Sequence, residues 1–398
     1  MDAIDHLLTR GVDSIYPNRE ALEKVLRSGR KLRLYQGFDP TGPQLHIGHA
    51  VALRKLREFQ KLGHHVIFLI GDFTGMIGDP TGKLSDRKIL TKETVSENAR
   101  TYKEQASRIL KFDGDNPVEI LHNSDWLGKM PAFEFLRIAN LLSVQQVVER
   151  DMFQERIKKD QDIFMNEFLY PVLQAYDSVA MNVDLEIGGS DQMFNMMMGR
   201  KLMRHMLKKE KFVMTVPLLT DANGVKIGKT EGNVIGLTDA PNEFYGKIMS
   251  LGDDAIIPCF RLLSDASDLE INAMKKSVLA GENPMNFKKK LAFELTKQFN
   301  SEKEAAVAQE EFETRFQKGQ ISEAALPTMS MNSMKTNSSI VESLVSLGLV
   351  SSKSDAKRLI EQKAVKVNGG VVATFKDAAK LKPGDTVEVG RKAVKIVS

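Results

Sequence analysis

Apolar residues along the first 225 positions recur in a pattern that predicts alternating strands and helices. The segment HHVIFLIG is a continuous apolar run that ends in glycine, as expected of a parallel strand buried on both faces. Alternation at this rhythm indicates an α/β fold with a doubly wound, Rossmann-like parallel sheet. The expected strands are 31–38, 64–75, 118–127 and 217–224, and the expected helices are 48–63 and 91–112.

The pattern changes after about residue 230, where helical periodicity continues to about residue 325 and predicts an all-α domain. Residues 326–338 are polar, contain Pro327 and are typical of a linker. Residues 339–398 return to short helical and strand patterns, which predict a small α+β domain. Within the first part, residues 126–165 hold more Leu, Met and Phe than one helix face needs. This insertion is expected either to pack against a second subunit or to fold onto its own sheet.

Composition narrows the class of protein. Of 398 residues, 42% are hydrophobic and 27% charged, which is ordinary for a globular protein. Cys259 is the single cysteine, which excludes a disulfide framework and favours a reducing, cytoplasmic location. The N-terminus lacks the pattern of a leader peptide, and the longest apolar runs are far too short to cross a bilayer.

The charge is concentrated at the C-terminal end. Residues 339–398 carry eleven Lys and Arg against six Asp and Glu, although the whole chain has a formal net charge of only +4. Such a basic segment fits a polyanionic partner, and it also fits a solvated, lysine-rich surface.

The segment GFDPTGPQLHIGHA (residues 37–50) leads from the first predicted strand into a helix. His46 and His49, three residues apart, lie on one helix face. A metal-binding pair, a structural pair that caps the helix and a nucleotide-phosphate site are all compatible with this spacing. No cluster of further metal ligands is evident, whereas a helix N-terminus favours anions. Gly37 permits close backbone approach, and Gly48 leaves room for a flat group such as adenine.

A second segment, VKIGKT (residues 225–230), places Lys226 and Lys229 around Gly228. Two lysines on a glycine-containing loop can reach a triphosphate as point charges. An exposed turn after a strand is the structural alternative. The combination with HIGH at residues 46–49 favours phosphate chemistry.

HIGH and KIGKT together resemble the two signature motifs of the class I aminoacyl-tRNA synthetases. YQGFDPT, GMIGDPTGK, YPVLQAYD and GGSDQ resemble the bacterial-type tyrosyl-tRNA synthetases within that class, and SKSDAKRLIEQKAVKVNG resembles their S4-type RNA-binding domain. The resemblance covers essentially the whole chain. The chain departs from the family pattern at Ile227-Gly228, where relatives carry Met-Ser, and at Met193-Phe194, where many carry Trp-Gly.

This resemblance implies a Rossmann-like catalytic domain (1–230) with a dimerisation insertion at about 126–165, a helical anticodon-recognition domain (231–325), the linker (326–338) and an S4-like domain (339–398). The implied reaction is ATP-dependent activation of L-tyrosine to tyrosyl-adenylate, followed by transfer to the 3′ end of tRNA-Tyr. Mg²⁺ accompanies ATP, and no dedicated metal site is implied. The implied partners are L-tyrosine, ATP, tRNA-Tyr and a second copy of the chain in a homodimer.

The resemblance also assigns residues to the nucleotide. Residues expected to contact the phosphates or close over pyrophosphate are Thr41, His46, Lys226, Lys229 and Thr230, and the catalytic His49 is expected against the ribose and adenine side. Residues expected to complete the ATP site, through backbone clearance or ribose contacts, are Gly37, Asp39, Gly48, Gly189 and Asp191.

The implied tyrosine pocket has three parts. The substrate ammonium faces Asp79, Tyr170 and Gln174, the carboxylate faces Gln192, and the phenol faces Tyr35 and Asp177. A site that hydrogen-bonds a substrate hydroxyl rejects the analogue without it, as is established for tyrosyl-tRNA synthetases against phenylalanine. Phosphate contacts to tRNA are expected from Lys353, Lys357, Arg358, Lys363 and Lys366. Lys83 and Arg87 fit contacts with tRNA or ATP and equally a solvated loop.

Three alternatives remain at this point. A tryptophan-specific enzyme is disfavoured by Tyr35 with Asp177. Another nucleotidyl transferase with an H-x-G-H turn is disfavoured by KIGKT, the helical domain and the basic tail. An RNA-binding protein that has lost its chemistry would show decay of His46, His49 or Lys229, and all three are present.

Overall fold

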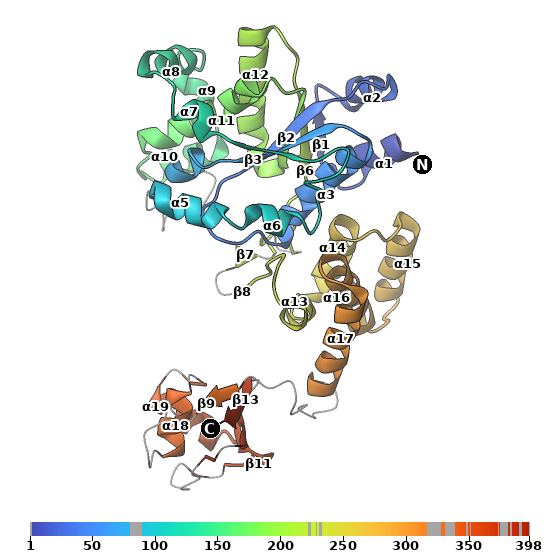
Figure 1. Ribbon diagram of the computed structural model, residues 1–398, viewed down its shortest axis with the longest axis vertical. Coiled ribbons are helices and arrows are strands. Elements are labelled where there is room, and N and C mark those ends of the chain that lie inside the picture. Colours follow the sequence, from blue (N-terminus) through green and yellow to red (C-terminus); the bar gives the residue numbers. More distant parts are fainter. Residues whose placement is uncertain are drawn as a thin grey trace. The chain divides into compact units, whose positions relative to one another are not determined.

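The chain divides into two compact units, residues 1–306 and 307–398, which we describe separately (Figure 1). The helices between residues 241 and 299, which follow the expected boundary at residue 230, belong to the first of these units, and the expected division into domains stays a prediction. The computed structural model describes residues 2–79, 90–221, 224–227, 229–230, 233–316, 328–330, 339–347, 349–350, 352–372, 374, 381–382, 384–389 and 392–397.

The first unit is built on a six-stranded sheet in the order β1-β6-β5-β2-β3-β4. All neighbours are parallel except β1, which runs antiparallel to β6. The expected α/β fold with a doubly wound sheet is thereby confirmed. Its strands are β1 (Ser14–Tyr16), β2 (Arg33–Phe38), β3 (His65–Ile70), β4 (Glu119–His122), β5 (Leu185–Gly189) and β6 (Phe212–Val216).

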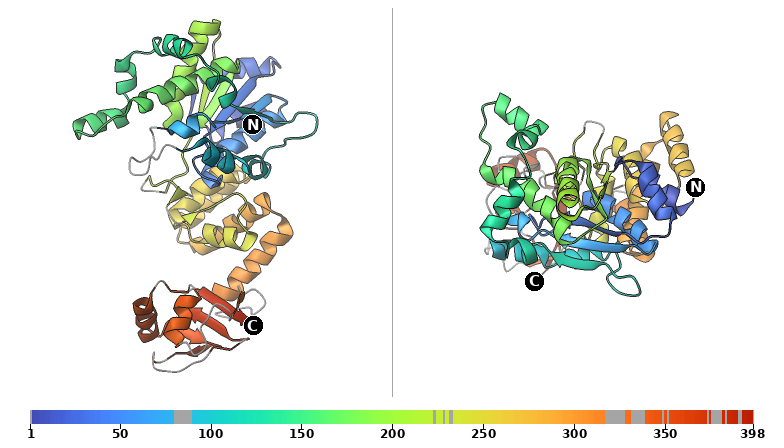
Figure 2. Two further views of the ribbon diagram at one scale, coloured as in Figure 1. Left: turned by 60° about the vertical axis from the view of Figure 1, so that its left-hand side comes forward. Right: turned by 90° about the horizontal axis from the view of Figure 1, so that it is seen from above.

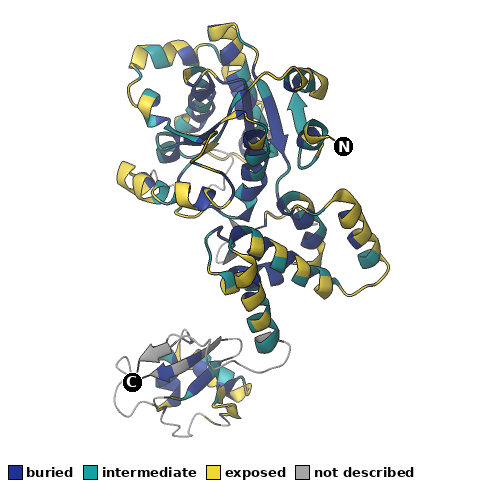
Figure 3. Cartoon of the chain, turned by 45° about the vertical axis from the view of Figure 1, so that its right-hand side comes forward, coloured by how far each residue is buried: buried dark blue, intermediate teal, exposed yellow. Residues whose placement is uncertain are grey.

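The chain winds in opposite directions from the middle of this sheet. The crossover from β2 to β3 contains α3 (Ile47–Lys61), and the crossover from β5 to β6 contains α12 (Met193–Leu207). Because such crossovers are right-handed, the two helices cover opposite faces. Residues 66–70 of β3 are all buried, as Figure 3 shows for the sheet in general. The direction reverses between β2 and β5, and their carboxyl ends form the switch point where ligands bind in such folds.

Further helices surround the sheet. They are α1 (Ala3–Thr9), α2 (Arg19–Arg27), α4 (Thr74–Ile77), α5 (Lys92–Ala99), α6 (Tyr102–Ala106), α7 (Ser124–Leu127), α8 (Ala132–Ala139), α9 (Val144–Val148), α10 (Asp151–Lys158), α11 (Met165–Ala180) and the 3₁₀ turn η2 (Ser190–Gln192). The region after the sheet contains the short strands β7 (Lys229–Thr230) and β8 (Asn233–Val234), then α13 (Pro241–Met249), η3 (Asp253–Ala255), α14 (Ile256–Leu263), α15 (Asp268–Leu279), α16 (Pro284–Phe299) and α17 (Glu302–Phe316).

Several expectations about these elements are wrong, including the extents of the predicted strands 64–75 and 118–127, which end at Ile70 and His122. In the predicted strand 217–224, the described residues 217–221 and 224 form no strand: β6 ends at Val216, because Pro217 has no N–H to donate to a sheet. The predicted helix 91–112 is two helices, α5 and α6. Tertiary contacts accompany the break, since Tyr102 Oη donates to the carbonyl of Gly42 at 2.7 Å and Gln105 accepts from the N–H of Leu45 at 2.6 Å. These contacts hold the loop that precedes His46.

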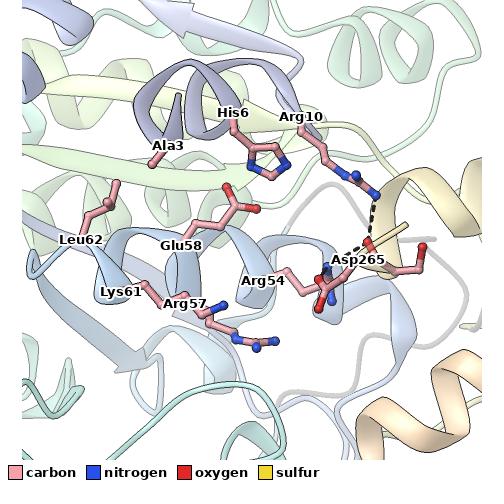
Figure 4. A pocket seen from close by; sticks show the side chains of 10 residues that line it. Ala3, His6, Arg10, Arg54, Arg57, Glu58, Lys61, Leu62 and Asp265 are labelled. Carbon is pink, nitrogen blue, oxygen red and sulfur yellow. Dashed lines mark hydrogen bonds and ion pairs between the residues drawn. The ribbon is translucent and has the colours of Figure 1, made fainter. Parts of the chain in front are cut away.

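The helical region is attached to the sheet region by two arginines. Arg10, which follows α1, donates to the carbonyls of Phe260, Ser264 and Ala266. Arg54 of α3 donates to the carbonyl of Ser264 and pairs with Asp265. Figure 4 shows both side chains at the rim of a cavity of about 300 Å³ between α1 and α3. This cavity shares no residue with the predicted site.

The second unit contains a five-stranded sheet in the order β11-β10-β12-β13-β9. Thr328–Ser330 lies within the segment expected to be a linker, but it forms β9 and pairs in parallel with β13. Its apolar core includes Leu344, Ile360 and Ile396, which are fully buried. The elements are β9, α18 (Ile340–Ser346), α19 (Lys353–Glu361), β10 (Val365–Val367), β11 (Gly370–Val371), β12 (Thr386–Val389) and β13 (Lys392–Val397).

Candidate active site

The predicted nucleotide and tyrosine residues gather at the switch point of the first sheet. The loop after β2 carries Asp39 and leads to His46, and the turn η2 after β5 carries Asp191 and Gln192. β2 and β5 are neighbours and parallel, so these two loops emerge at the same edge. Segments 150 residues apart in sequence are thereby brought to one place.

His46 and His49 are oriented by the backbone of α3. His46 is the N-cap residue, and its Nδ1 accepts a hydrogen bond from the N–H of Gly48 at 3.2 Å. Nδ1 of His49 accepts from the N–H of His46 at 3.1 Å. A ring nitrogen that accepts carries no proton, so the proton of each neutral imidazole lies on Nε2. The capping and phosphate interpretations are therefore compatible, since capping uses Nδ1 and leaves Nε2–H as the donor at a helix N-terminus.

Gly48 also makes room for a neighbouring side chain. A Cβ at this position would lie 2.9 Å from Cε1 of His46, and the expected room for adenine stays a prediction. The two imidazole centroids are 4.0 Å apart. Gly37 and Thr41 are exposed beside them, Gly37 in β2 and Thr41 in the loop that follows. The expected contacts of Gly37 and Thr41 with the nucleotide stay predictions.

Asp39 is held at the start of the same loop. Its carboxylate accepts from Oγ1 of Thr74 at 2.7 Å and from Oη of Tyr170 at 2.8 Å. Burial raises the pKa of Asp39 to about 7, although both hydrogen bonds oppose the shift. Gly71 is required here, because any Cβ on it would collide with the Asp39 carboxylate.

The predicted phenol-binding residues are buried. Tyr35 on β2 is 1% exposed and Asp177 on α11 is 2% exposed. Asp177 accepts from Nε1 of Trp126 at 2.7 Å and from Nδ2 of Asn123 at 3.3 Å. Burial nevertheless raises the pKa of Asp177 well above its usual range. The Tyr35 hydroxyl is hydrogen-bonded to Oγ of Ser178 at 2.9 Å.

The remaining predicted tyrosine-binding residues form a connected polar group. Gln192 donates to Asp79 at 2.5 Å. Asn195, on the first turn of α12, donates to Oε1 of Gln192 at 3.0 Å and to Oε1 of Gln174 at 2.9 Å. Tyr170 is hydrogen-bonded to Asp39 instead, as described above. The structure thus links Gln174 of α11, Gln192 of η2 and Asn195 of α12 in one hydrogen-bonded group.

The KIGKT segment reaches the switch point through Lys226. Its Nζ lies 2.8 Å from Oδ2 of Asp191, which is the predicted ribose-binding carboxylate. Gly189 precedes that turn, and a Cβ on it would lie 2.6 Å from the Asp191 carboxylate. Lys229 and Thr230 form β7, and their side chains lie outside the described part of the structure, as do Gly228, Lys83 and Arg87.

The predicted tRNA-contacting residues lie in the second unit. Lys353, Lys357 and Arg358 are exposed on α19, whose Ala356 and Ile360 face the core. Lys353 pairs with Glu342 and Arg358 pairs with Asp355, both at the surface. The other two, Lys363 and Lys366, are exposed after the helix.

Several residues of this site belong to no sequence motif and were not predicted. Their positions depend on contacts between distant segments, and the only sequence signal was that Trp126 is the single tryptophan. The missed residues are Gly71, Thr74, Asn123, Trp126, Ser178, Glu186, Asn195 and Lys211.

The fold and site geometry described above are those of a class I tRNA synthetase. The family model described as tRNA synthetases class I (W and Y) matches residues 27–317, and the S4 domain model matches residues 340–390. The chain is 44% identical over 371 residues to tyrosine–tRNA ligase of Mannheimia succiniciproducens, with 93% of this chain and 92% of that protein covered. It is 45% identical over 365 residues to tyrosine–tRNA ligase 2 of Pseudoalteromonas translucida, with 91% and 90% covered. The chain therefore belongs to the tyrosine–tRNA ligase family.

Solved structures agree on the fold. The truncated mitochondrial tyrosyl-tRNA synthetase of Coccidioides posadasii superposes with a TM-score of 0.63 at 23% identity, covering 78% of this chain and 91% of that one. Tyrosyl-tRNA synthetase of Archaeoglobus fulgidus, solved with L-tyrosine, gives 0.61 at 20% identity, covering 77% and 100%.

Proposed function

We propose that this protein activates L-tyrosine with ATP, releases pyrophosphate and transfers tyrosine to the 3′ end of tRNA-Tyr. The observation that carries the proposal is the buried carboxyl group of Asp177, which Trp126 and Asn123 hold near the buried Tyr35. A buried acceptor of this kind suits a ligand that brings a hydroxyl to the end of an apolar slot. Family membership supports the same activity.

In the activation step, a carboxylate oxygen of tyrosine attacks the α-phosphorus of ATP, and the bond to the β-phosphate bridging oxygen breaks. Negative charge grows on the leaving pyrophosphate. We assign Nε2–H of His46 and His49, with Thr41 and Lys226, to that charge, because preorganised donors stabilise developing charge most effectively. Lys229 and Thr230 are assigned the same task by family resemblance. The second step is attack of a tRNA ribose hydroxyl on the acyl carbon, with AMP leaving.

The tyrosine itself is held by the polar network at the switch point. We assign Asp79, Tyr170 and Gln174 to the substrate ammonium and Gln192 to its carboxylate. For ATP we assign Asp39 and Asp191 to the ribose side, with Gly37, Gly48 and Gly189 allowing close backbone approach. Lys226 would have to leave Asp191 when ribose binds there, and an exposed ion pair of this type is weak enough to permit the exchange.

Mg²⁺ is proposed to arrive with ATP. Among the described residues, no three His, Cys, Asp or Glu side chains converge as a metal site. Mg²⁺ commonly keeps several waters and is bound through substrate phosphates, so ATP itself supplies the main ligands.

A homodimer is proposed through the 126–165 segment. This short region concentrates exposed apolar side chains in α8, α9 and the start of α11. Figure 2 shows these helices at the edge of the first unit, away from α13–α16. Such an exposed group marks an interaction surface. The residues are Phe133, Leu136, Val144, Phe164 and Met165, together with Ile157 of α10.

The tRNA is proposed to contact both the helices after residue 231 and the exposed lysines of α19. Phosphate contacts by such lysines add affinity that falls with salt concentration and supply register rather than base reading. In the described part of the chain, no helix has the length and apolar character needed to span a membrane. A cytoplasmic location remains a prediction from the single buried Cys259.

The experiment that tests the proposed function is exchange of labelled pyrophosphate into ATP with tyrosine, phenylalanine or tryptophan and no tRNA. We expect exchange with tyrosine alone, followed in a second assay by tyrosine transfer to tRNA-Tyr. Exchange with tryptophan alone would establish the tryptophan-specific alternative. Folded protein that exchanges with none of the three would contradict the enzyme assignment.

A further inference from the structure

A buried ion pair is hydrogen-bonded to Gln174, a predicted tyrosine-binding residue, and to Ser178, the partner of Tyr35, and has no assigned role. Glu186 on β5 and Lys211, one residue before β6, are in contact through Oε2 and Nζ. Lys211 is 0% exposed and Glu186 is 2% exposed. Neither residue belongs to a motif that the sequence offered.

The stability of the fold does not explain this pair. Removing two charges from water costs free energy that their attraction often fails to recover, and apolar replacements of similar volume are commonly neutral or stabilising. Ser178, also fully buried, is the third member, since Lys211 donates to its Oγ at 2.8 Å. A buried ionic group that is retained in spite of this cost calls for a further role.

The hydrogen bonds of Glu186 indicate what this further role is. Its Oε1 accepts from Nε2 of Gln174 at 3.2 Å, and its Oε2 lies 3.3 Å from Oγ of Ser178 as the acceptor. Ser178 in turn is hydrogen-bonded to the Tyr35 hydroxyl at 2.9 Å. The ion pair therefore reaches both ends of the predicted tyrosine site, the phenol end through Tyr35 and the ammonium end through Gln174.

The direction of the Gln174 amide follows from the same contacts. Its N–H points at Glu186, and its oxygen accepts from Asn195 at 2.9 Å. A carboxylate can only accept when ionised, so an ionised Glu186 allows one amide orientation, whereas a neutral amide at that position would allow either. Lys211 lies against Glu186 as its ion-pair partner and donates to Ser178, so the three side chains fix one another in place.

Gly199 on α12 leaves the space that the cluster occupies. A Cβ there would lie 2.5 Å from Nζ of Lys211, 2.9 Å from Oγ of Ser178 and 3.3 Å from Oε2 of Glu186. One methyl group at residue 199 would thus disturb all three polar groups while every charge stays in the chain.

We propose that the buried Lys211–Glu186 pair is a positioning element that sets tyrosine affinity and tyrosine-over-phenylalanine selectivity, by fixing the Tyr35 hydroxyl through Ser178 and the Gln174 amide directly. Neither residue of the pair is assigned a contact with substrate. The proposal rests on the proposed function, because it assigns the pocket to tyrosine.

Two variants test it by different means. The double variant Glu186→Gln/Lys211→Met removes both charges at similar volume, so that no unpaired buried charge remains. Gly199→Ala keeps the charges and displaces the cluster. Lys55→Met is the matched control, because Lys55 is a buried lysine (2% exposed) that contacts Leu7 and Glu58 and shares no partner with the cluster.

The primary readout is emission of Trp126, the single tryptophan, whose Nε1 donates to Asp177 in the pocket. Tyrosine is titrated without ATP, and pyrophosphate exchange is measured in parallel for tyrosine and phenylalanine. We expect the double variant and Gly199→Ala each to weaken tyrosine binding about tenfold, the effect of about one well-placed hydrogen bond. The selectivity ratio should fall by a similar factor, with the KM for ATP unchanged and Lys55→Met like the original protein.

A purely structural role would lower the unfolding temperature of the cluster variants and leave tyrosine affinity and selectivity unchanged in the folded protein, which would overturn the proposal. Equal loss of affinity in Lys55→Met would overturn it as well. Failure of the proposed function is a separate outcome, since it would show as absence of tyrosine-dependent exchange in the original protein.

Discussion

The proposed active site has a proposed phenol end and a proposed phosphate end, and the two are built in different ways. At the phenol end, Tyr35 and Asp177 are almost fully buried and each is hydrogen-bonded to side chains from other parts of the chain. At the phosphate end, His46 and His49 are held by the backbone of their own helix turn, and Lys226 is an exposed cation paired with Asp191.

The difference in burial and hydrogen bonding fits two tasks, recognition of tyrosine at one end and catalysis at the other. A pocket that must reject phenylalanine gains from rigid, desolvated partners, because an unpaired buried group is then costly. A site that stabilises charge on a departing pyrophosphate gains from donors that can meet and release it. We therefore infer that the tyrosine end is complete before substrates arrive and that ATP completes the phosphate end.

The largest expected effect comes from His46. His46→Asn keeps a side chain that caps helices well but lacks the reach of Nε2, so we expect kcat for exchange to fall by about 10²–10³, typical for removal of one transition-state donor. Tyrosine affinity should be unchanged. His46→Ala, which also removes the cap, should lower the free energy of unfolding by about a further 1 kcal/mol. An equal loss of tyrosine affinity in both variants would contradict the separation of the two ends.

For Asp177 we expect a smaller effect, which changes tyrosine affinity rather than kcat. Asp177→Asn replaces one carboxyl oxygen by an NH₂ group that cannot accept, which loses about one hydrogen bond, worth about 0.5–1.5 kcal/mol or about 2–13-fold in affinity. Tyrosine binding should weaken by that factor, and phenylalanine binding and the KM for ATP should change little. Calorimetric titration of both amino acids measures this, and a parallel loss for phenylalanine would show that Asp177 only supports the fold.

Asp39, between the two ends, should make stability depend on pH. Its pKa is about 7 in the folded chain and about 4 when unfolded, so the folded state holds the proton more tightly. Its contribution to stability is complete below about pH 4 and is lost as the pH rises to 7. Asp39→Asn cannot ionise and should gain stability relative to the original protein between pH 4.5 and 8, by up to about 4 kcal/mol. Urea unfolding at both pH values measures the gain, which should be absent if Asp39 ionises normally.

Local signals in the sequence predicted the sheet, the two phosphate-binding segments and the family resemblance. The last strand of the sheet was predicted at 217–224, whereas β6 is Phe212–Val216 and ends before Pro217. Local signals also treated residues 118–127 as one strand, whereas Trp126 lies in α7, where its side chain reaches Asp177. Glu186 and Lys211 were not identified, because a buried pair between adjacent strands has no local pattern. The assigned roles of the individual site residues stay predictions until they are measured.

The central claim is that the tyrosine pocket is assembled before ATP binds, and Trp126 offers a direct test. As the single tryptophan, it donates to the carboxylate that should meet the substrate phenol. Titration with tyrosine alone should change its emission to saturation, while phenylalanine at equal concentration and ATP alone leave it unchanged. Emission that responds to tyrosine only when ATP or a non-hydrolysable analogue is present would contradict the account.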